Sequence, residues 1–244
     1  MLQQTKGIVL RSVRYGETSL ITHIFTRTYG IQTYLVQGVR KAGVKGNKAG
    51  LLQPASLLDL VVYQKPFGNM QRIKEYQFAW IYTSLQEEIV KNSIALFSVE
   101  VLYRLLPEHA PMSDLYDFAA DYFEQLDRMS LAAVANFPLF FVIQCSRFLG
   151  YEIKGSFSEQ TQYLNLQEGG FTDHPPLAAP FVTQEEAQML DRLLQVSTFS
   201  ELERTAMNAT MRFNLLDWFI AFLHRHTQHM GPVRSLDVLR AILH

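Results

Sequence analysis

The chain has 244 residues, of which 48% are hydrophobic and 18% charged, so it can bury one large core or two modest ones and is not a generally disordered chain. Its formal net charge is −1, and its single cysteine, Cys145, excludes an internal disulfide framework and a cysteine-based zinc site within one chain. No apolar run reaches the length needed to cross a membrane, and residues 1–7 lack the apolar centre of a secretory signal. These features fit a reducing cytoplasm.

The first eighty residues predict a small β-barrel. Apolar and polar side chains alternate over five short segments, which are separated by turns such as Tyr15-Gly16-Glu17. The expected strands cover residues 7–14, 19–26, 31–37, 57–63 and 71–77. Five strands in about eighty residues is the size of an OB-fold.

From residue 78 onward the apolar period changes to that of helices. The expected helices cover residues 80–106 (as one helix or two), 114–128 with Ser113 as N-cap, 131–149, Asn208 or Thr210 to about His226, and 234–243. The pairs Thr183/Glu186 and Ser200/Glu203 have the spacing of capping boxes and predict two more helix starts. The sequence thus predicts an α+β multidomain fold, with an OB-fold domain at 1–79 and a helical domain at 80–244. Residues 151–180, rich in glycine and proline, are expected to form a non-helical insertion.

The net charge hides a strong asymmetry. Residues 1–80 carry eleven Lys and Arg against three acids, a balance of +8, which leaves eleven bases and twenty acids, or −9, for the remainder. Within the basic half, residues 39–50 hold four cations, three glycines and no acid. The candidate phosphate contacts are Arg11, Arg14, Arg27, Arg40, Lys41, Lys45 and Lys48. The basic half therefore predicts a polyanion as partner, although a solvated loop that maintains solubility is the simpler alternative.

Aromatic residues accompany these cations, as in barrels that hold single strands by stacking bases on rings. The candidates are Tyr15, Tyr29, Tyr34, Tyr63 and Phe67, some of which must belong to the core instead. In the helical half, Arg104 and Arg147 are candidates for the rim of a groove that binds an acidic, apolar peptide.

Signals for catalysis are weak. The three widely spaced acids of the basic half do not suit two-metal phosphoryl chemistry, and no Walker-type glycine loop is present. Cys145 lies in an apolar helix, where a structural role is expected. His226 and His229 are three residues apart but lack a nearby carboxylate or cysteine, so cations at a helix C-terminus are a better interpretation than a metal site. No enzyme activity, cofactor or metal is expected.

A series of short motifs runs along the chain. In the N-terminal part it consists of Gly7, Val9, Leu10, Tyr15-Gly16-Glu17, Phe25-Thr26-Arg27, Gly30, Gly38 and Arg40-Lys41. It continues with Leu52-Gln53-Pro54, residues 103–108 (YRLLPE), Phe148-Leu149-Gly150-Tyr151 and the C-terminal HTQHMGPVRSLDVLRAIL. This series resembles the RecO family, the bacterial recombination mediators of the RecFOR pathway, and the resemblance covers the whole chain in order.

The resemblance implies an N-terminal OB domain and a helical C-terminal domain. It further implies binding of single- and double-stranded DNA, annealing of complementary strands, and help to RecA, together with RecR, in replacing the single-strand-binding protein SSB, whose C-terminal tail docks on the helical domain. Many members of the family carry a four-cysteine zinc module between the helices. This chain has no cysteine there, and residues 163–171 resemble what remains of that hairpin, so zinc is expected to be absent.

We therefore expect a non-enzymatic mediator of DNA repair and recombination, cytoplasmic and nucleoid-associated, without a membrane partner. An RNA- or tRNA-binding module on the same barrel and a nuclease are the alternatives.

Overall fold

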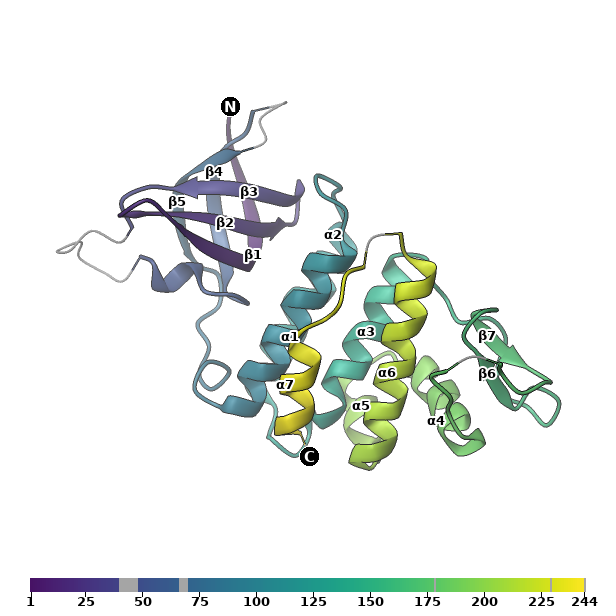
Figure 1. Cartoon of the computed structure of the whole chain (residues 1–244). Helices are drawn as coiled ribbons and strands as arrows, with labels where there is room; N and C mark the ends of the chain where they lie inside the picture. The colour runs from purple at the N-terminus through teal and green to yellow at the C-terminus, as the bar shows by residue number, and fades with distance from the viewer. Residues whose placement is uncertain (40–47, 66–69, 178, 229, 244) are drawn as a thin grey trace. The chain divides into compact units, whose positions relative to one another are not determined.

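The computed structural model describes residues 1–39, 48–65, 70–177, 179–228 and 230–243. The chain forms two compact units, coloured by residue number in Figure 1. The barrel unit comprises Met1–Glu87 and Leu106–Arg128, and the helical unit comprises Glu88–Leu105 and Met129–His244. Residues 106–128 thus group with the barrel, while the boundary between residues 79 and 80 stays a prediction.

Five strands close into a barrel in the order β1-β2-β3-β5-β4. The strands are β1 (Leu2–Tyr15), β2 (Ser19–Thr26), β3 (Gly30–Val36), β4 (Leu57–Tyr63) and β5 (Gln71–Phe78). All pairs are antiparallel except β3 with β5, which run parallel. The expected α+β fold, an OB-like barrel followed by helices, is confirmed.

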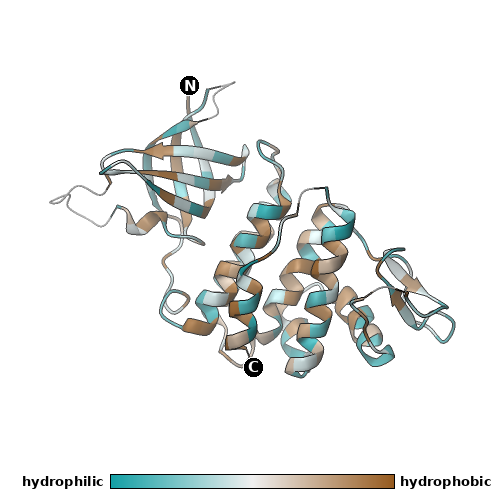
Figure 2. Ribbon diagram, viewed as in Figure 1, coloured by the Kyte–Doolittle hydropathy of each residue, from teal (hydrophilic) through white to brown (hydrophobic). Residues whose placement is uncertain are grey.

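The barrel core follows from the two-residue period of its strands. Figure 2 shows hydrophobic and hydrophilic residues alternating along them. Val9, Ile24, Tyr34 and Leu58 are buried and form the centre of the core. Strand β1 begins earlier than predicted because its polar first half pairs with β4, from Leu2 opposite Tyr63 onward. These long-range backbone hydrogen bonds hold the residues in a strand, although their side chains do not alternate between polar and apolar.

Helix α2 (Ser113–Arg128) and the segment before it pack on the barrel. The rings of Phe25 and Tyr116 meet edge to face with centroids 5.6 Å apart. Glu108 bridges to Ile31 on β3, and Gly30 lies directly against the backbone of Ala110. These contacts explain why α2 belongs to the barrel unit.

The prediction of a helix from residue 80 is wrong for its first turns, because α1 begins only at Ile89 and ends at Leu105. The carboxylate of Asp127 accepts hydrogen bonds from the backbone N–H groups of Thr83, Ser84 and Leu85 at 2.8–3.1 Å. These groups would otherwise be free for a helical ladder, so the acid on α2 holds this segment in a turn.

The helical unit is built from α1, α3 (Phe137–Phe148), α4 (Gln184–Gln195), α5 (Phe199–Arg204), α6 (Ala209–His226) and α7 (Ser235–Ile242). Helix α3 packs against α1 and α6, α1 also against α7, and α4 against α6. Two short 3-10 turns, at Gly50–Leu52 in the barrel unit and Val134–Asn136 here, complete the elements. Within the part of the chain that the structure describes, no helix is long and apolar enough to cross a membrane.

Helix starts follow capping chemistry, with one correction. The expected box of Thr183 and Glu186 is present at the start of α4, and Asn208 caps α6. The second box lies two residues earlier than predicted, because Thr198 and Glu201, not Ser200 and Glu203, make the reciprocal bonds. Ser200 lies in the first turn of α5 instead.

A short hairpin, β6 (Tyr163–Asn165) and β7 (Gly170–Thr172), interrupts the helices within the predicted insertion. Leu164, Leu166 and Phe171 are buried, and the ring of His226 lies 3.1 Å from the carbonyl oxygen of Leu166. Apolar packing and this contact from α6 hold the hairpin.

Candidate nucleic-acid interface

The outer face of β1, β2 and β3 presents two rows of side chains. Strand register places Arg11, His23 and Thr33 in one row and Val13, Ile21 and Leu35 in the next. The first row is polar, with an exposed arginine at its edge, and the second is apolar and partly exposed. In OB-folds this face, with the β1–β2 and β4–β5 loops, is where oligonucleotides bind.

His23 was not among the predicted site residues, although the alternation of β2 marks it as lying on one face of the strand. Its Nδ1 lies 3.2 Å from the Thr33 hydroxyl. Burial lowers the pKa of His23, and the positive charge of Arg11 lowers it further against a smaller opposing effect of Glu108. The imidazole is therefore neutral at neutral pH, and Arg11 supplies the charge of this row.

Arg11 and Arg14 do not share a face. Residues three apart on a strand point to opposite sides. Arg11 and Val13 face outward over β2, whereas Ser12 bonds to Thr22 (2.8 Å) and to the carbonyl oxygen of Leu52 (2.7 Å), and Arg14 lies on the Ser12 side. Both arginines are exposed, so each is open to a ligand, but from different directions.

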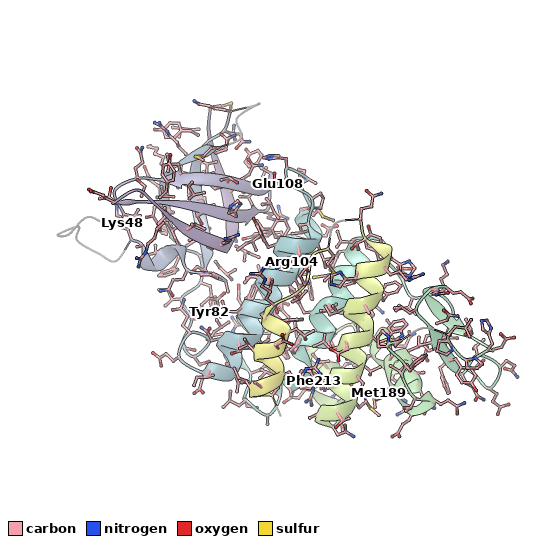
Figure 3. All side chains as sticks on the ribbon, in the orientation of Figure 1. Lys48, Tyr82, Arg104, Glu108, Met189 and Phe213 are labelled. Atoms are coloured by element: carbon pink, nitrogen blue, oxygen red, sulfur yellow. The ribbon has the colours of Figure 1, made fainter. Side chains whose placement is uncertain are left out.

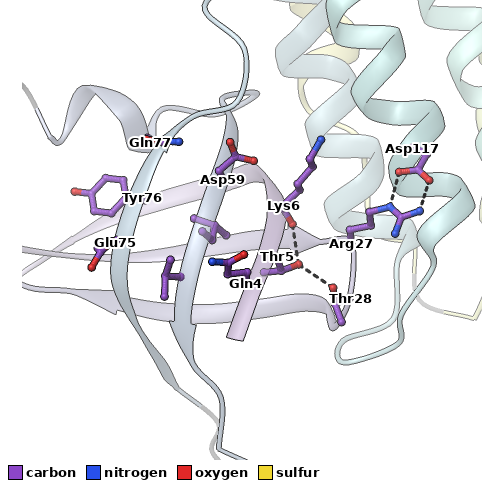
Figure 4. A pocket seen from close by; sticks show the side chains of 12 residues that line it. Gln4, Thr5, Lys6, Arg27, Thr28, Asp59, Glu75, Tyr76, Gln77 and Asp117 are labelled. Carbon is purple, nitrogen blue, oxygen red and sulfur yellow. Dashed lines mark hydrogen bonds and ion pairs between the residues drawn. The ribbon is translucent and has the colours of Figure 1, made fainter. Parts of the chain in front are cut away.

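Arg27 is engaged by an acid. It follows β2, and its guanidinium donates to both carboxylate oxygens of Asp117 on α2 (Figure 4). The pair stands at the edge of an open pocket of about 950 Å³ on the outer face of β1, β4 and β5. The lining residues are Gln4, Thr5, Lys6, Arg27, Thr28, Asp59, Leu60, Val61, Glu75, Tyr76, Gln77 and Asp117. This lining mixes the acids Asp59, Glu75 and Asp117 with the cations Lys6 and Arg27, a combination that disfavours a phosphate there.

Of the predicted basic loop, Arg40, Lys41 and Lys45 lie outside the described residues. Lys48 is exposed on the barrel unit (Figure 3), and its carbonyl oxygen accepts a hydrogen bond from the Tyr76 hydroxyl at 3.2 Å. This bond holds the backbone of Lys48 beside β5.

The aromatic candidates separate by burial. Tyr34 is fully buried in the barrel core, and Tyr29 packs against that core, so stacking on Tyr34 is ruled out. Tyr15 and Tyr63 are exposed at the ends of β1 and β4. Phe67 lies outside the described residues.

The two arginines of the helical unit lie in different surroundings. Arg104 on α1 (Figure 3) forms an ion pair with Glu100 at 2.7 Å, and Gly231 leaves room for its guanidinium. Arg147 on α3 donates to the carbonyl oxygen of Leu194 and lines a pocket of about 310 Å³. The rest of that lining is Ile143, Ser146, Tyr151, Glu152, Ile153, Gly155, Asp191, Leu194, Gln195 and Phe219. Arg147 therefore stands beside a pocket whose lining mixes apolar side chains with the acids Glu152 and Asp191.

The chain does not fit a four-cysteine zinc module. Its one cysteine, Cys145, is buried in α3, where burial raises the pKa of the thiol far above its usual range. The hairpin β6–β7 contains none. Among the described residues, no three His, Cys, Asp or Glu side chains converge as a metal site would require.

Comparison with known proteins identifies the family. Residues 1–82 match the model for the N-terminal part of recombination protein O, and residues 86–237 match the model for its C-terminal part. The chain belongs to the RecO family. The proteins named DNA repair protein RecO from Phocaeicola vulgatus and Bacteroides fragilis are each 31% identical to it, over 242 and 245 residues. The protein of the same name from Christiangramia forsetii is 27% identical over 242 residues, and in all three pairs 99% of each chain is covered.

The matches to the two RecO family models end and begin on either side of a short turn. Residues 83–85 lie between the two matches, and their backbone N–H groups donate hydrogen bonds to the carboxylate of Asp127. In the turns after β1 and β2, Gly16 and Gly30 both have positive φ.

Proposed function

We propose that this chain binds single- and double-stranded DNA without sequence specificity through its barrel unit, anneals complementary strands and helps load a recombinase onto SSB-coated DNA. Its proposed partners are DNA, RecR and the C-terminal tail of SSB, with RecA as an indirect partner. It is proposed to do this without enzymatic activity or cofactor, in the cytoplasm at the nucleoid. Membership in a family of DNA repair proteins supports the proposal.

One structural observation supports the proposed binding of DNA. A closed OB-like barrel presents Arg11 beside an apolar row on the face that such barrels use, within residues 1–80, which have a charge balance of +8. Cations on such a face bind phosphates and release counterions. Because phosphates are the same in every sequence and in both strand states, this contact is sequence-independent.

Annealing follows from the same physics. Two complementary strands repel each other through their phosphates, and a basic surface that neutralises part of this charge lets them approach and pair. Arg11, Arg14 and Lys48 are exposed and are proposed to contact phosphate directly. Arg27 is proposed to do so only when a phosphate replaces Asp117.

The proposed tail site is the pocket beside Arg147. Its apolar members suit the apolar end of a peptide, and Arg147 suits a carboxylate. Glu152 and Asp191 also line this pocket, so an acidic peptide is expected to enter from the Arg147 side.

A binding titration tests the DNA function. For the parent and single-stranded DNA, a plot of log K against log salt concentration should have a slope of roughly −0.7 for each phosphate contact. Changing Arg40, Lys41, Lys45 and Lys48 together to Glu should abolish most of this binding, whereas Arg192→Gln on exposed α4 of the helical unit should not change it. A folded variant that binds DNA like the parent would remove this loop from the interface.

Two further assays separate the alternatives. Stronger competition by RNA than by single-stranded DNA at matched salt would favour an RNA-binding module. Divalent-metal-dependent cleavage of DNA by the purified chain would favour a nuclease and contradict the proposal.

A further inference from the structure

A second, smaller pocket of the barrel unit lies at the base of the β4–β5 loop. Its volume is about 300 Å³, and it is lined by Tyr63, Lys65, Met70, Gln71 and Arg72. Tyr63 ends β4 and stands directly opposite Arg72 on β5. The pocket is therefore formed by the two strand ends themselves.

A pair of reciprocal hydrogen bonds fixes the shape of this pocket. The backbone N–H of Lys65 donates to Oε1 of Gln71 at 3.0 Å, and Nε2 of Gln71 donates to the carbonyl oxygen of Lys65 at 3.1 Å. Gln71 is itself buried, so this brace is shielded from water. It holds the two sides of the loop base together and so sets the position of Lys65 relative to Arg72.

The pocket combines an exposed ring with two available cations. Tyr63 is 42% exposed and Met70 is 43% exposed, so both side chains are open to a ligand. Lys65 and Arg72 are also exposed, and neither forms an ion pair with a described carboxylate. Lys74, by contrast, is on the same strand but is paired with Glu75 at 3.2 Å.

The pocket is continuous with the candidate DNA face. Arg72 on β5 is the register partner of Leu35 on β3, and Leu35 is the partner of Ile21 on β2. The apolar row of the face therefore leads to Arg72 and, across the β4–β5 pair, to Tyr63. Tyr15 is at least as exposed, at 55%, but lines none of the three pockets described above.

We propose that this pocket binds one unstacked base of a DNA single strand on the ring of Tyr63, with the adjoining phosphates on Lys65 and Arg72. The proposal rests on the DNA-binding function above. Every base has a face that can stack on an aromatic ring, so the contact is independent of sequence. Bases in a duplex are already stacked and paired, so the pocket distinguishes single strands from duplex, which phosphate contacts on the barrel do not.

The test compares binding of oligo(dT) and of a duplex of equal length at matched salt. Tyr63→Ala should lower the affinity for oligo(dT) about tenfold, or ~1.4 kcal/mol, which lies within the range for one stacked base, and should change duplex affinity less than twofold. Tyr63→Phe should bind oligo(dT) like the parent, because the ring remains. Phe181→Ala is the control, an exposed ring of the helical unit outside the proposed interface, and should also bind like the parent.

Three results would overturn the pocket while leaving the DNA function in place. They are unchanged oligo(dT) binding by Tyr63→Ala, an equal loss for oligo(dT) and duplex, or an equal loss for Phe181→Ala. A parent that binds neither DNA form would instead overturn the proposed function itself.

Two readouts test the geometry directly. A strand containing 2-aminopurine should change its emission on binding the parent and not on binding Tyr63→Ala, because the probe reports stacking of the base. The double change of Lys65 and Arg72 to Gln should lower the salt slope for single strands by about 1.4, at about 0.7 per phosphate. Lys74→Gln should leave the slope unchanged, and an equal effect of both would contradict the proposal.

Discussion

The guanidinium of Arg27 donates two parallel hydrogen bonds to the carboxylate of Asp117, each 2.7 Å long, across ninety residues of sequence. Their mutual bonding raises the pKa of Arg27 and lowers that of Asp117, so both stay charged at neutral pH. Arg27 has the fork geometry that suits a phosphate as well as a carboxylate. If the barrel unit binds DNA as proposed, Asp117 competes with phosphate for Arg27, one of the predicted phosphate contacts.

Replacing Asp117 by Asn should release that contact. The Asp117→Asn variant should bind single-stranded DNA more tightly at low salt, with a salt slope steeper by about 0.7, as expected for one added phosphate. Asp121→Asn, one turn further along α2, is the control, because Asp121 bonds to Gln125 and to no described cation. Equal slopes for the parent and Asp117→Asn would show that Arg27 is not part of the interface.

Gly30 is expected to be intolerant of any side chain. Its φ is +67°, and a Cβ there would lie within 2.8 Å of the backbone O, C and N atoms of Ala110. Gly30→Ala should therefore lower the free energy of unfolding by ~3 kcal/mol or more, because backbone strain adds to a clash with a chain that packs on the barrel. Urea denaturation followed by circular dichroism measures this.

Gly16 provides the matched control for that substitution. Its φ is +60°, but nothing lies within 4 Å of a Cβ at this position. Gly16→Ala should cost only the strain of the left-handed conformation, ~1 kcal/mol. Equal losses at both glycines would show that the contact with Ala110 does not contribute.

The Asp127 carboxylate should make the barrel unit sensitive to acid. Burial by itself raises the pKa of Asp127, but the hydrogen bonds from Ser84, Thr83 and Leu85 together lower it to about 2. Since the unfolded value is about 3.9, the stabilisation of ~2 kcal/mol is complete above about pH 5 and is lost as the pH falls toward 2. Asp127→Asn should remove it at pH 7 and cost progressively less below pH 4.

Hydrogen exchange locates this effect. In Asp127→Asn the amides of residues 83–85 should exchange faster at pH 7, while those of α6 should keep their protection. An unfolding free energy of Asp127→Asn that differs from the parent equally at pH 7 and pH 3 would contradict the carboxylate's role.

The peptide site should depend on Arg147 and not on Arg104. An acidic, apolar peptide with a free carboxylate should bind the parent, and Arg147→Ala should weaken it about tenfold, because a charge-assisted contact is lost. Arg104→Ala should bind the peptide as the parent does, since its guanidinium is paired with Glu100. Fluorescence anisotropy of a labelled peptide in low salt measures both, and an equal loss in the two variants would exclude the Arg147 pocket as the site.

Local patterns were sufficient for much of the fold. Alternation predicted the second and fourth strands with their observed bounds, Ser19–Thr26 and Leu57–Tyr63, and the cap at Asn208 predicted the start of α6. The turns before α1 were wrongly predicted as helix because the carboxylate of Asp127, more than forty residues away, accepts hydrogen bonds from the backbone N–H groups of that segment. The misplaced capping box has a closer cause, since Thr198 and Ser200 both have a glutamate three residues on.

The sequence by itself determined the two-part architecture and the charge split between its halves, because strand period, helix period and composition are properties of neighbouring residues and totals. Only the tertiary structure decided which candidate residues remain available. In the closed barrel, the side chain of Tyr34 points into the core and that of Tyr63 is exposed. Helix α2 places Asp117 within hydrogen-bond distance of Arg27. Availability depends on pairing register and on partners distant along the chain, which local sequence does not encode.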